Sequence, residues 1–242
     1  MSAAISIMHP GRGGNRFLEA LSPRDYAQLR PHLEHVQLVR GDAVYQEGAA
    51  VRSLYFVQRG IISQVKTMSD GRTVEIGAVG IEGMLGWNAA LGMKHGLLDA
   101  MVQVPGEALR VDTAVFQKAV QESPALRDLT QRFAEHALAD IAQTAACNRL
   151  HSLEERCCRW LLIAHDSARS DKFSLTHEFL AMMLGVQRTA VSIAASLLRR
   201  AGFIEYSRGT VTVTDRRGLE GMSCECYKSI QERLIHLYAR RD

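Results

Sequence analysis

The chain has 242 residues, 47% of them hydrophobic and 23% charged, so it can bury a core and is long enough for two small domains. No apolar run approaches the roughly 20 residues that cross a bilayer. The start MSAAISIMHPGRGGNRF lacks the order of a signal peptide, so we expect a cytoplasmic protein with no membrane partner. Five cysteines without a repeated CxxC argue against a disulfide scaffold.

The first unit, residues 16–120, changes from helical to β character along the chain. Residues 16–35 indicate helix, with a serine before a proline in SPRD. Between residues 36 and 111, short β-prone runs alternate with glycine-rich turns, of which SDGR at 69–72 is typical of a hairpin. Many short strands at close spacing predict an antiparallel β-roll.

Residues 113–147 return to helical spacing, and a long helix over 121–147 is expected to form the dimer contact. A long helix with a narrow apolar seam often pairs with its own copy. Packing of this seam on its own domain is the alternative. The apolar positions recur every three to four residues: Leu126, Leu129, Phe133, Ala137, Ile141 and Ala145.

The second unit, residues 148–218, combines short helices with a hairpin. RLHSLEERCCRWLLIAHD predicts an amphipathic helix, and GFIEYSRGTVTVTD predicts a β-hairpin that turns at Arg208-Gly209. A final helix is expected over 219–242. This unit carries 11 Lys/Arg against 7 Asp/Glu, whereas residues 16–147 carry 13 against 15. The local positive charge suits a polyanionic partner.

SLTHEFLAMMLGVQRTAVSIAASLLRR predicts a helix-turn-helix. Thr176 suits the cap of a first helix, and Gly185 falls where a tight turn requires positive φ. The second helix begins near Gln187 or Arg188. A plain αα-hairpin is the alternative, but the following β-hairpin and the basic charge favour a DNA-binding unit. The inward positions of the second helix are Val191, Ala194, Ala195 and Leu198.

In such a motif the second helix enters the major groove of double-stranded DNA with its N-terminal residues leading. Arginine can grip guanine and glutamine can grip adenine, each through two hydrogen bonds. Thr176 and His177 are placed to touch a phosphate, and Arg208 at the hairpin tip could reach the DNA backbone. The expected base-reading residues are Gln187, Arg188, Thr189 and Ser192.

LTHEFLAMMLGVQRTAVSIAASLLRRAGFIEYSRGTVTV resembles the winged helix of the Crp/Fnr superfamily of bacterial transcription regulators. VRGDAVYQEGAAVRSLYFVQRGIISQVKTMSDGRTVEIGAVGIEGMLG is similar to the family's β-roll. The resemblance covers nearly the whole chain and implies an α+β fold with a jelly-roll-like sensor domain. It further implies a homodimer joined by the long helix, a palindromic DNA site and RNA polymerase as a further partner.

The resemblance also implies two departures from the family's best-known members. Their acidic residue after the arginine is here Thr189, and their second arginine is Ile193, so the preferred operator should differ. Members that bind cyclic nucleotides use a Gly-Glu step and an Arg-Ser/Thr-Ala step, which align with Gly86-Trp87 and Leu98-Asp99-Ala100. We expect a degenerate effector pocket at Gly86, Trp87, Leu98 and Asp99 that does not bind cyclic AMP in the usual way, and no cofactor.

The sequence predicts neither a catalytic nor a metal site. The family's oxygen sensors carry cysteines near the N-terminus, but residues 1–146 contain none. Cys224-x-Cys226 is not a usual zinc spacing, although a redox role for this pair stays open, and His95 is expected at the surface. No nucleophile–base arrangement suggests an enzyme.

The remaining alternative is a ligand-binding signalling module whose helix-turn-helix contacts another protein. The effector, the target genes and the sign of regulation are not encoded in any motif.

Overall fold

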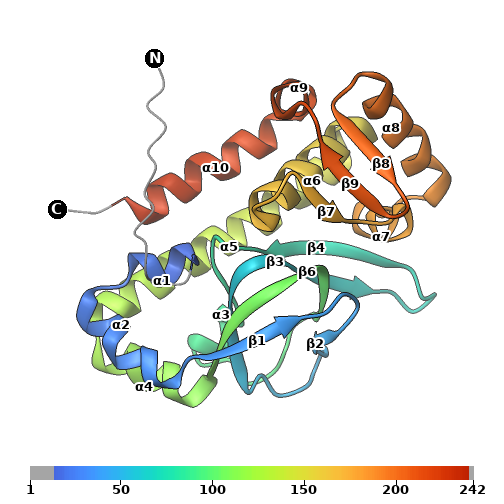
Figure 1. Ribbon diagram of the computed structural model, residues 1–242. Helices are drawn as coiled ribbons and strands as arrows, with labels where there is room; N and C mark the ends of the chain where they lie inside the picture. Colours follow the sequence, from blue (N-terminus) through green and yellow to red (C-terminus); the bar gives the residue numbers. More distant parts are fainter. Residues whose placement is uncertain (1–13, 240–242) are drawn as a thin grey trace.

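The computed structural model describes residues 14–239, so most of the segment considered as a possible signal peptide lies outside the described part. A β-sheet unit and a compact helical unit are joined by one long helix (Figure 1). A C-terminal helix returns beside the long helix toward the first helices of the chain (Figure 1). This arrangement confirms the expected α+β architecture with an antiparallel sheet first and a helix-turn-helix second.

The N-terminal helical segment is divided into short pieces. It contains α1 (Arg16–Ala20), α2 (Pro23–Leu29) and a 3-10 turn, η1 (Arg30–His32). The Ser22 side chain accepts from the Asp25 N–H and Pro23 occupies the first helical position, so a new helix begins there. The cap motif in SPRD is confirmed.

The sensor sheet is wholly antiparallel and is organised around two long strands. Its order is β1-β6-β3-β4, with β2 paired to β6 and β5 paired to β3. The turn at residues 69–72 joins β3 to β4, and Gly71 has φ +83° there, as the Asp-Gly signal predicts. A short helix, α3 (Trp87–Ala90), follows the sheet's smallest strand. The strands are β1 (Glu34–Leu38), β2 (Ala43–Tyr45), β3 (Ser53–Thr67), β4 (Thr73–Val79), β5 (Met84–Leu85) and β6 (Asp99–Asp112).

Two helices occupy the region expected to hold the long helix. α4 (Thr113–Glu122) ends before Ser123, whose side chain caps α5 (Pro124–Leu150). The long helix therefore covers 124–150 rather than 121–147. Leu126 and Phe133 are buried, and the Phe133 ring lies 5.7 Å from that of Phe17 in the chain's own core. The first half of the predicted seam thus packs on its own domain, which was the alternative to a dimer contact.

The second unit forms a winged helix-turn-helix. Its three strands have the order β7-β9-β8, and α7 and α8 cross at 109°. A capping box between Ser152 and Glu155 starts α6, so this helix begins at Leu153 and not within the preceding Arg149–His151 segment. The elements are α6 (Leu153–Ala168), β7 (Lys172–Ser174), α7 (His177–Leu184), α8 (Arg188–Arg200), β8 (Ile204–Ser207) and β9 (Thr210–Val213).

Among the helices of residues 14–239, none is by itself long and apolar enough to cross a membrane. Only the sharply bent α7–α8 pair meets the length and composition test when both helices are taken together.

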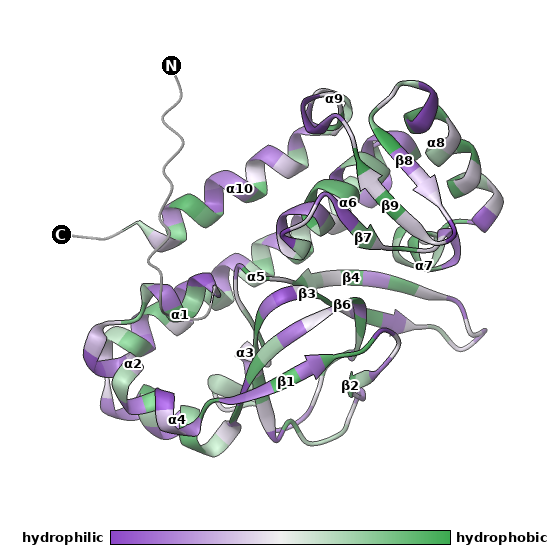
Figure 2. Ribbon diagram, viewed as in Figure 1, coloured by the Kyte–Doolittle hydropathy of each residue, from purple (hydrophilic) through white to green (hydrophobic). Residues whose placement is uncertain are grey.

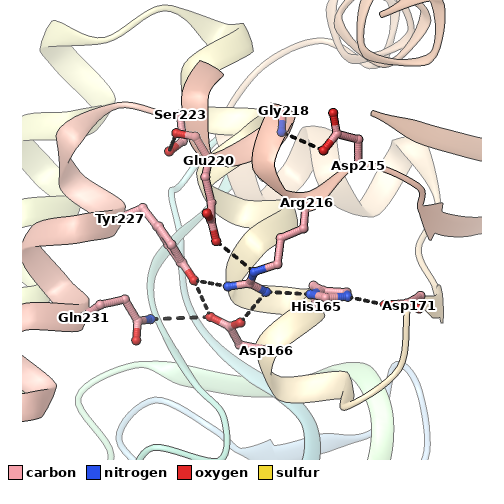
Figure 3. A network of polar contacts seen from close by, with 10 residues as sticks. All are labelled: His165, Asp166, Asp171, Asp215, Arg216, Gly218, Glu220, Ser223, Tyr227 and Gln231. Atoms are coloured by element: carbon pink, nitrogen blue, oxygen red, sulfur yellow. Dashed lines mark hydrogen bonds and ion pairs between the residues drawn. The ribbon is translucent and has the colours of Figure 1, made fainter. Parts of the chain in front are cut away.

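The C-terminal region contains two helices rather than the single one expected over 219–242. α9 (Arg216–Met222) ends at Ser223, and α10 (Glu225–Tyr238) begins after Cys224. Arg216 donates to Asp166 and to the Tyr227 hydroxyl, which connects α6, α9 and α10 (Figure 3). The expected apolar face of the last helix is confirmed, since its four members are all buried: Tyr227, Ile230, Leu234 and Leu237.

The two units share a core and do not merely meet at a linker. Ile61 and Val65 of β3 belong to the same buried cluster as Leu161 and Val191 of the winged helix. The amphipathic helices α5, α8 and α10 show both hydrophobic and hydrophilic residues along their length (Figure 2). Burial of one face of each helix therefore orients the DNA-binding unit against the sheet.

Candidate nucleic-acid interface

The candidate DNA contacts of the second unit meet around one groove. Four of the seven residues expected from the sequence line it, although they come from the start of α7, the start of α8 and the hairpin tip. The hairpin therefore stands beside the helix-turn-helix as a wing. The residues lining the groove are Thr176, His177, Glu178, Arg188, Tyr206, Arg208 and Gly209.

The first turn of α8 is polar and exposed. Gln187 is its N-cap and makes no capping side-chain hydrogen bond, and both Arg188 and Thr189 are exposed. The opposite side is buried through the four positions predicted for it: Val191, Ala194, Ala195 and Leu198. Gly185 has φ +64° and ends α7, so the tight turn between the helices needs a residue without a Cβ. The local sequence thus determines that the first turn of α8 is exposed and that one side of the helix is buried.

Ser192 and His177 are bound to each other within the fold. The Ser192 hydroxyl donates to the Arg188 carbonyl at 3.0 Å and lies 2.9 Å from His177 Nδ1. The imidazole ring stacks on Tyr206 with a centroid distance of 4.2 Å, and its Nε2 is buried without a hydrogen-bond partner among the described residues. Burial, and then the Arg188 charge, lower the pKa of His177. Both side chains are thus engaged within the fold, and the DNA contacts expected of His177 and Ser192 stay predictions.

The wing is attached to the start of α7. Leu175 N–H donates to the Gly209 carbonyl at 2.9 Å, and the Tyr206 hydroxyl donates to the Leu175 carbonyl at 3.1 Å. Arg208 and Gly209 have φ of +48° and +76°, which is the backbone of a tight two-residue hairpin turn. The turn leaves Arg208 exposed at the tip, and Thr176 retains a free hydroxyl hydrogen because its oxygen accepts from Phe179 N–H. Both residues can therefore contact a phosphate.

Sequence reasoning named Ile193 only as a departure from the family's arginine, and it did not include Glu178 in this surface. Ile193 is 64% exposed. It lies one turn after Thr189, on the side of α8 that is not buried. The sequence indicates this exposure, because Ile193 falls out of phase with the buried positions of α8. Glu178 lines the groove, although only its favourable place in the first helical turn was apparent from the sequence. Glu178 thus adds a carboxylate to the groove, whereas the exposed Ile193 is not among the residues that line it.

The four residues expected around a degenerate effector pocket do not share one cavity. Trp87 lines a cavity of about 100 Å³ between β4, α5, α6 and α10, but Gly86, Leu98 and Asp99 do not line it. Asp99 lies at the start of β6 and accepts from the Glu47 N–H at 2.9 Å. His95 is exposed, as expected. The expected effector pocket at these four positions therefore stays a prediction.

The cavity contains several buried acidic groups. Burial raises the pKa of Glu75 and of Glu82 to about 7, and it also raises the pKa of Asp140. Glu75 accepts from Ser63 Oγ at 2.5 Å and from Trp160 Nε1 at 3.1 Å, so it bridges the sensor sheet and α6. Arg159 lies 3.5 Å from Asp140. The cavity is therefore lined by both acidic groups and cationic side chains, the latter including Arg16, Arg156 and Arg159.

A separate cluster of ligating atoms lies at the junction of α5 and α10. Cys147 and His151 come from the end of α5, and Cys224 and Cys226 come from the start of α10. Their four ligand atoms lie within 4.8 Å of one another. The sequence argument weighed Cys224 and Cys226 alone and missed the two ligands that the long helix contributes. This cluster could hold a metal ion.

Comparisons with known proteins agree with the two-unit architecture. A cyclic nucleotide-binding domain model matches residues 35–123, and a Crp-like helix-turn-helix domain model matches residues 155–222. No curated protein matches the chain in a sequence search.

Solved structures of transcription regulators have the same fold. FixK2 from Bradyrhizobium japonicum is 17% identical, with a TM-score of 0.67 and coverage of 79% of this chain and 98% of its own. TTHB099, a CRP-family regulator from Thermus thermophilus, is 22% identical, with a TM-score of 0.63 and coverage of 78% and 96%. The c-di-GMP-responsive regulator CLP from Xanthomonas campestris is 16% identical, with a TM-score of 0.59 and coverage of 79% and 99%.

The two family models occur in the chain order of a sensor domain followed by a DNA-binding domain, and they correspond to the β-roll and the winged helix described above. Both predicted resemblances are therefore confirmed. The chain belongs to the Crp/Fnr superfamily of transcription regulators.

Proposed function

We propose that this regulator binds a palindromic operator as a homodimer, with Arg188 as its main base-reading residue. The observation that carries the proposal is the groove that joins Arg188 on α8 to Thr176 on α7 and Arg208 on the wing. A helix that enters the major groove by its N-terminus would place Arg188 at a base edge and would place Thr176 and Arg208 at the flanking phosphates.

Base recognition depends on the first two turns of α8. Arg188 is exposed and can donate two hydrogen bonds to guanine, and Gln187 can do the same to adenine. Thr189 tolerates several bases, whereas the exposed Ile193 favours the methyl group of thymine. The expected half-site therefore contains guanine opposite Arg188 and thymine about one helical turn further along α8.

The sensor is proposed not to take cyclic AMP in the usual way. A cavity of about 100 Å³ is well below the roughly 300–1,000 Å³ of typical small-molecule sites. Its lining combines the acidic Glu75, Glu82 and Asp140 with the cationic Arg16, Arg156 and Arg159, so this charge by itself does not select against an anion. Trp87 and Leu98 stand where the resembling members use glutamate and arginine. An unpaired phosphate buried there would cost several kcal/mol.

The dimer contact is proposed on the exposed side of α5. Leu138 is 58% exposed, and Ala142 and Ala145 continue its side of the helix with the spacing of a coiled-coil seam. This face shares Ala145 with the predicted seam, whose first three members pack on their own domain. Two copies joined there would present two wings and two α8 helices to a two-fold site. Contact with RNA polymerase is part of the same proposal.

The test is a selection of bound sequences from random double-stranded DNA, followed by fluorescence anisotropy with the full chain. We expect an inverted repeat and an affinity that falls linearly with salt on logarithmic axes. Arg208→Ala should weaken binding to all sequences alike and lower the salt slope by about 1. Absent or salt-insensitive binding would overturn the proposal and favour a protein-interaction role for the helix-turn-helix.

Calorimetry with cyclic AMP tests the sensor separately. We expect no heat of binding at micromolar ligand, because the phosphate would lack a cationic partner at the two family steps. Micromolar binding of one cyclic AMP per chain would contradict the degenerate pocket while leaving the DNA-binding proposal intact.

A further inference from the structure

We propose that Cys147, His151, Cys224 and Cys226 form a tetrahedral site for one Zn²⁺ ion at the junction of α5 and α10. Three of these residues are buried and the fourth, His151, is half-buried. The set matches the three-cysteine, one-histidine composition of closed structural zinc sites. It lies outside the DNA-facing groove and does not depend on the proposed operator.

The distances suit a single ion. Cys147 Sγ lies 3.6 Å from Cys224 Sγ, and Cys226 Sγ lies 3.5 Å from His151 Nδ1. A tetrahedral ion with Zn–S bonds of about 2.3 Å holds its sulfur ligands about 3.8 Å apart. An iron–sulfur cluster spreads its thiolates farther because they bind different iron atoms. The ligand atoms here already lie within 4.8 Å of one another.

Helix geometry explains how so short a C-x-C spacing can serve. Cys147 and His151 are four residues apart at the end of α5, so they lie on one side of it. Cys224 is the N-cap of α10 with an extended backbone, and Cys226 falls in the first turn. Each helix end supplies two ligands, and the positive end of the α10 dipole favours thiolates. Tertiary packing rather than local spacing completes the set.

A second layer of hydrogen bonds orients the ligands. His151 Nε2 lies 3.2 Å from the Glu225 carboxylate, which leaves Nδ1 directed at Cys226 Sγ. Gln143 Nε2 donates to Cys226 Sγ at 3.0 Å. A carboxylate behind a histidine ligand is a recurrent feature of zinc sites because it sets the tautomer and ring orientation. The arrangement therefore goes beyond an accidental group of thiols.

The other two cysteines of the chain lie apart from this cluster. Cys157 and Cys158 lie in the core of the winged helix, and burial raises the pKa of both thiols. Three of the five cysteines therefore belong to the cluster, and the other two belong to the core of the winged helix.

An ion at this junction would tie the C-terminal helix to the long helix. The chain passes from α5 to α6 at His151 and Ser152, and α10 is also held on α6 through Tyr227 and Asp166 (Figure 3). Zinc would add an anchor where the sensor unit continues into the winged helix. All four coordination positions would be filled by protein, so the role is structural and not catalytic.

Elemental analysis of the full chain, purified under reducing conditions with zinc, tests the site. We expect one zinc ion per chain, and replacement by Co²⁺ should produce thiolate charge-transfer absorption and the visible bands of tetrahedral cobalt. Cys226→Ser and His151→Ala should lose stoichiometric binding. Cys157→Ala is the matched control, since it removes a buried cysteine outside the site and should retain one ion.

Two further measurements show whether a loss of zinc binding results from unfolding. Gln143→Leu leaves all four ligands in place and should weaken zinc binding about 10-fold, as expected for an outer hydrogen bond. Circular dichroism should show that each variant keeps its helices. Metal-free protein with five titratable thiols, a Cys147–Cys224 disulfide in the isolated chain, or iron with acid-labile sulfide would each overturn the zinc site. Retention of a full equivalent by both ligand variants would do the same.

Discussion

The groove proposed to face DNA and the cysteine junction are built on opposite principles. The groove uses residues between Thr176 and Gly209, and most of its determinants are caps and turns that act over a few residues. The junction joins Cys147 to Cys224 across 77 positions, and neither end shows a recognised motif. Local conformational preferences can specify the first kind of site. Only long-range packing assembles the second, so ligand spacing along the chain does not reveal it.

The cavity lined by Trp87 and Glu75 belongs with the cysteine junction in this comparison. Glu75 of β4 meets Trp160 of α6 because the sheet and the winged helix share a core. The groove is thus a property of one unit, whereas the cavity and the cysteine cluster are properties of the contacts between units. Variants that affect one kind of region without the other test whether this division holds.

The largest expected effect is on DNA recognition. Arg188→Ala should cost roughly 1–3 kcal/mol at the cognate operator and relax specificity at the contacted base pair, because a bidentate contact is lost. Arg199→Ala is the control, since Arg199 is exposed in the last turn of the same helix. Fluorescence anisotropy on cognate and mutated operators measures both. An equal loss on every sequence would make Arg188 a phosphate contact instead.

A substitution at Gly185, in the turn between α7 and α8, tests how much a local backbone preference contributes to the free energy of unfolding. Gly185→Ala should lower the free energy of unfolding by about 1–2 kcal/mol, because a side chain at φ +64° is strained. The new Cβ would also meet Val74 of β4 at 3.1 Å. Gly221→Ala, whose Cβ meets nothing within 4 Å, should leave stability nearly unchanged or raise it. Urea titration compares the two, and equal effects would contradict the strain argument.

The contact between the units should respond to pH. The Glu75 pKa is raised from 4.5 to about 7, so the native carboxyl keeps a proton that the unfolded chain loses in this interval. The contribution of Glu75 to the free energy of unfolding therefore falls as pH rises from about 4.5 to about 7, with a slope of at most about 1.4 kcal/mol per pH unit. Glu75→Gln should remove this part of the slope.

Other groups with shifted pKa values produce the remaining slope in that variant. Glu82, with a pKa also raised to about 7, acts in the same direction, and His136, with a pKa lowered to about 4, acts in the opposite one. Asp140 and Arg159 face the same site and remain in both proteins. Urea titrations of wild type and variant between about pH 5 and about pH 7.5 isolate the difference. Parallel curves would show that Glu75 does not carry a raised pKa.

The smallest effect concerns the cap of α7. Thr176→Ala should reduce the free energy of unfolding by about 1 kcal/mol, because the Phe179 N–H loses its side-chain acceptor. Thr176→Ser keeps the oxygen and should restore most of that stability. Urea titration with both variants is the measurement. If serine and alanine behave alike, the cap is not what stabilises this helix start.

Some of the fold could be predicted because its causes are local. The buried positions of α8, the turn at Gly185 and the hairpin at Arg208 all follow from periodicity or from backbone preferences of single residues. The helix boundaries were harder: a cap at Ser123 divides α4 from α5, and the capping box at Ser152 starts α6. Apolar spacing continues across both breaks, so periodicity alone does not reveal them.

The candidate contacts divide in the same way. Arg188 and Arg208 are exposed and Thr176 is half-buried at the groove, whereas the hydroxyl of Ser192 and the ring of His177 are engaged with each other. Exposure of a helix face can be predicted from its pattern. Whether a polar side chain is already satisfied depends on a neighbour from another helix, and sequence spacing carries no such information.

By itself, the sequence determined the order of a β-roll, a long helix and a winged helix, and it determined the polar first turn of α8. Hydrophobic period, caps and turn residues act within a few positions, so they can be recognised without coordinates. The tertiary structure decided which face of α5 is covered, which groups surround Glu75, and that Cys147 and His151 meet Cys224 and Cys226. These outcomes depend on how whole elements pack, because burial is a cooperative property of the complete chain.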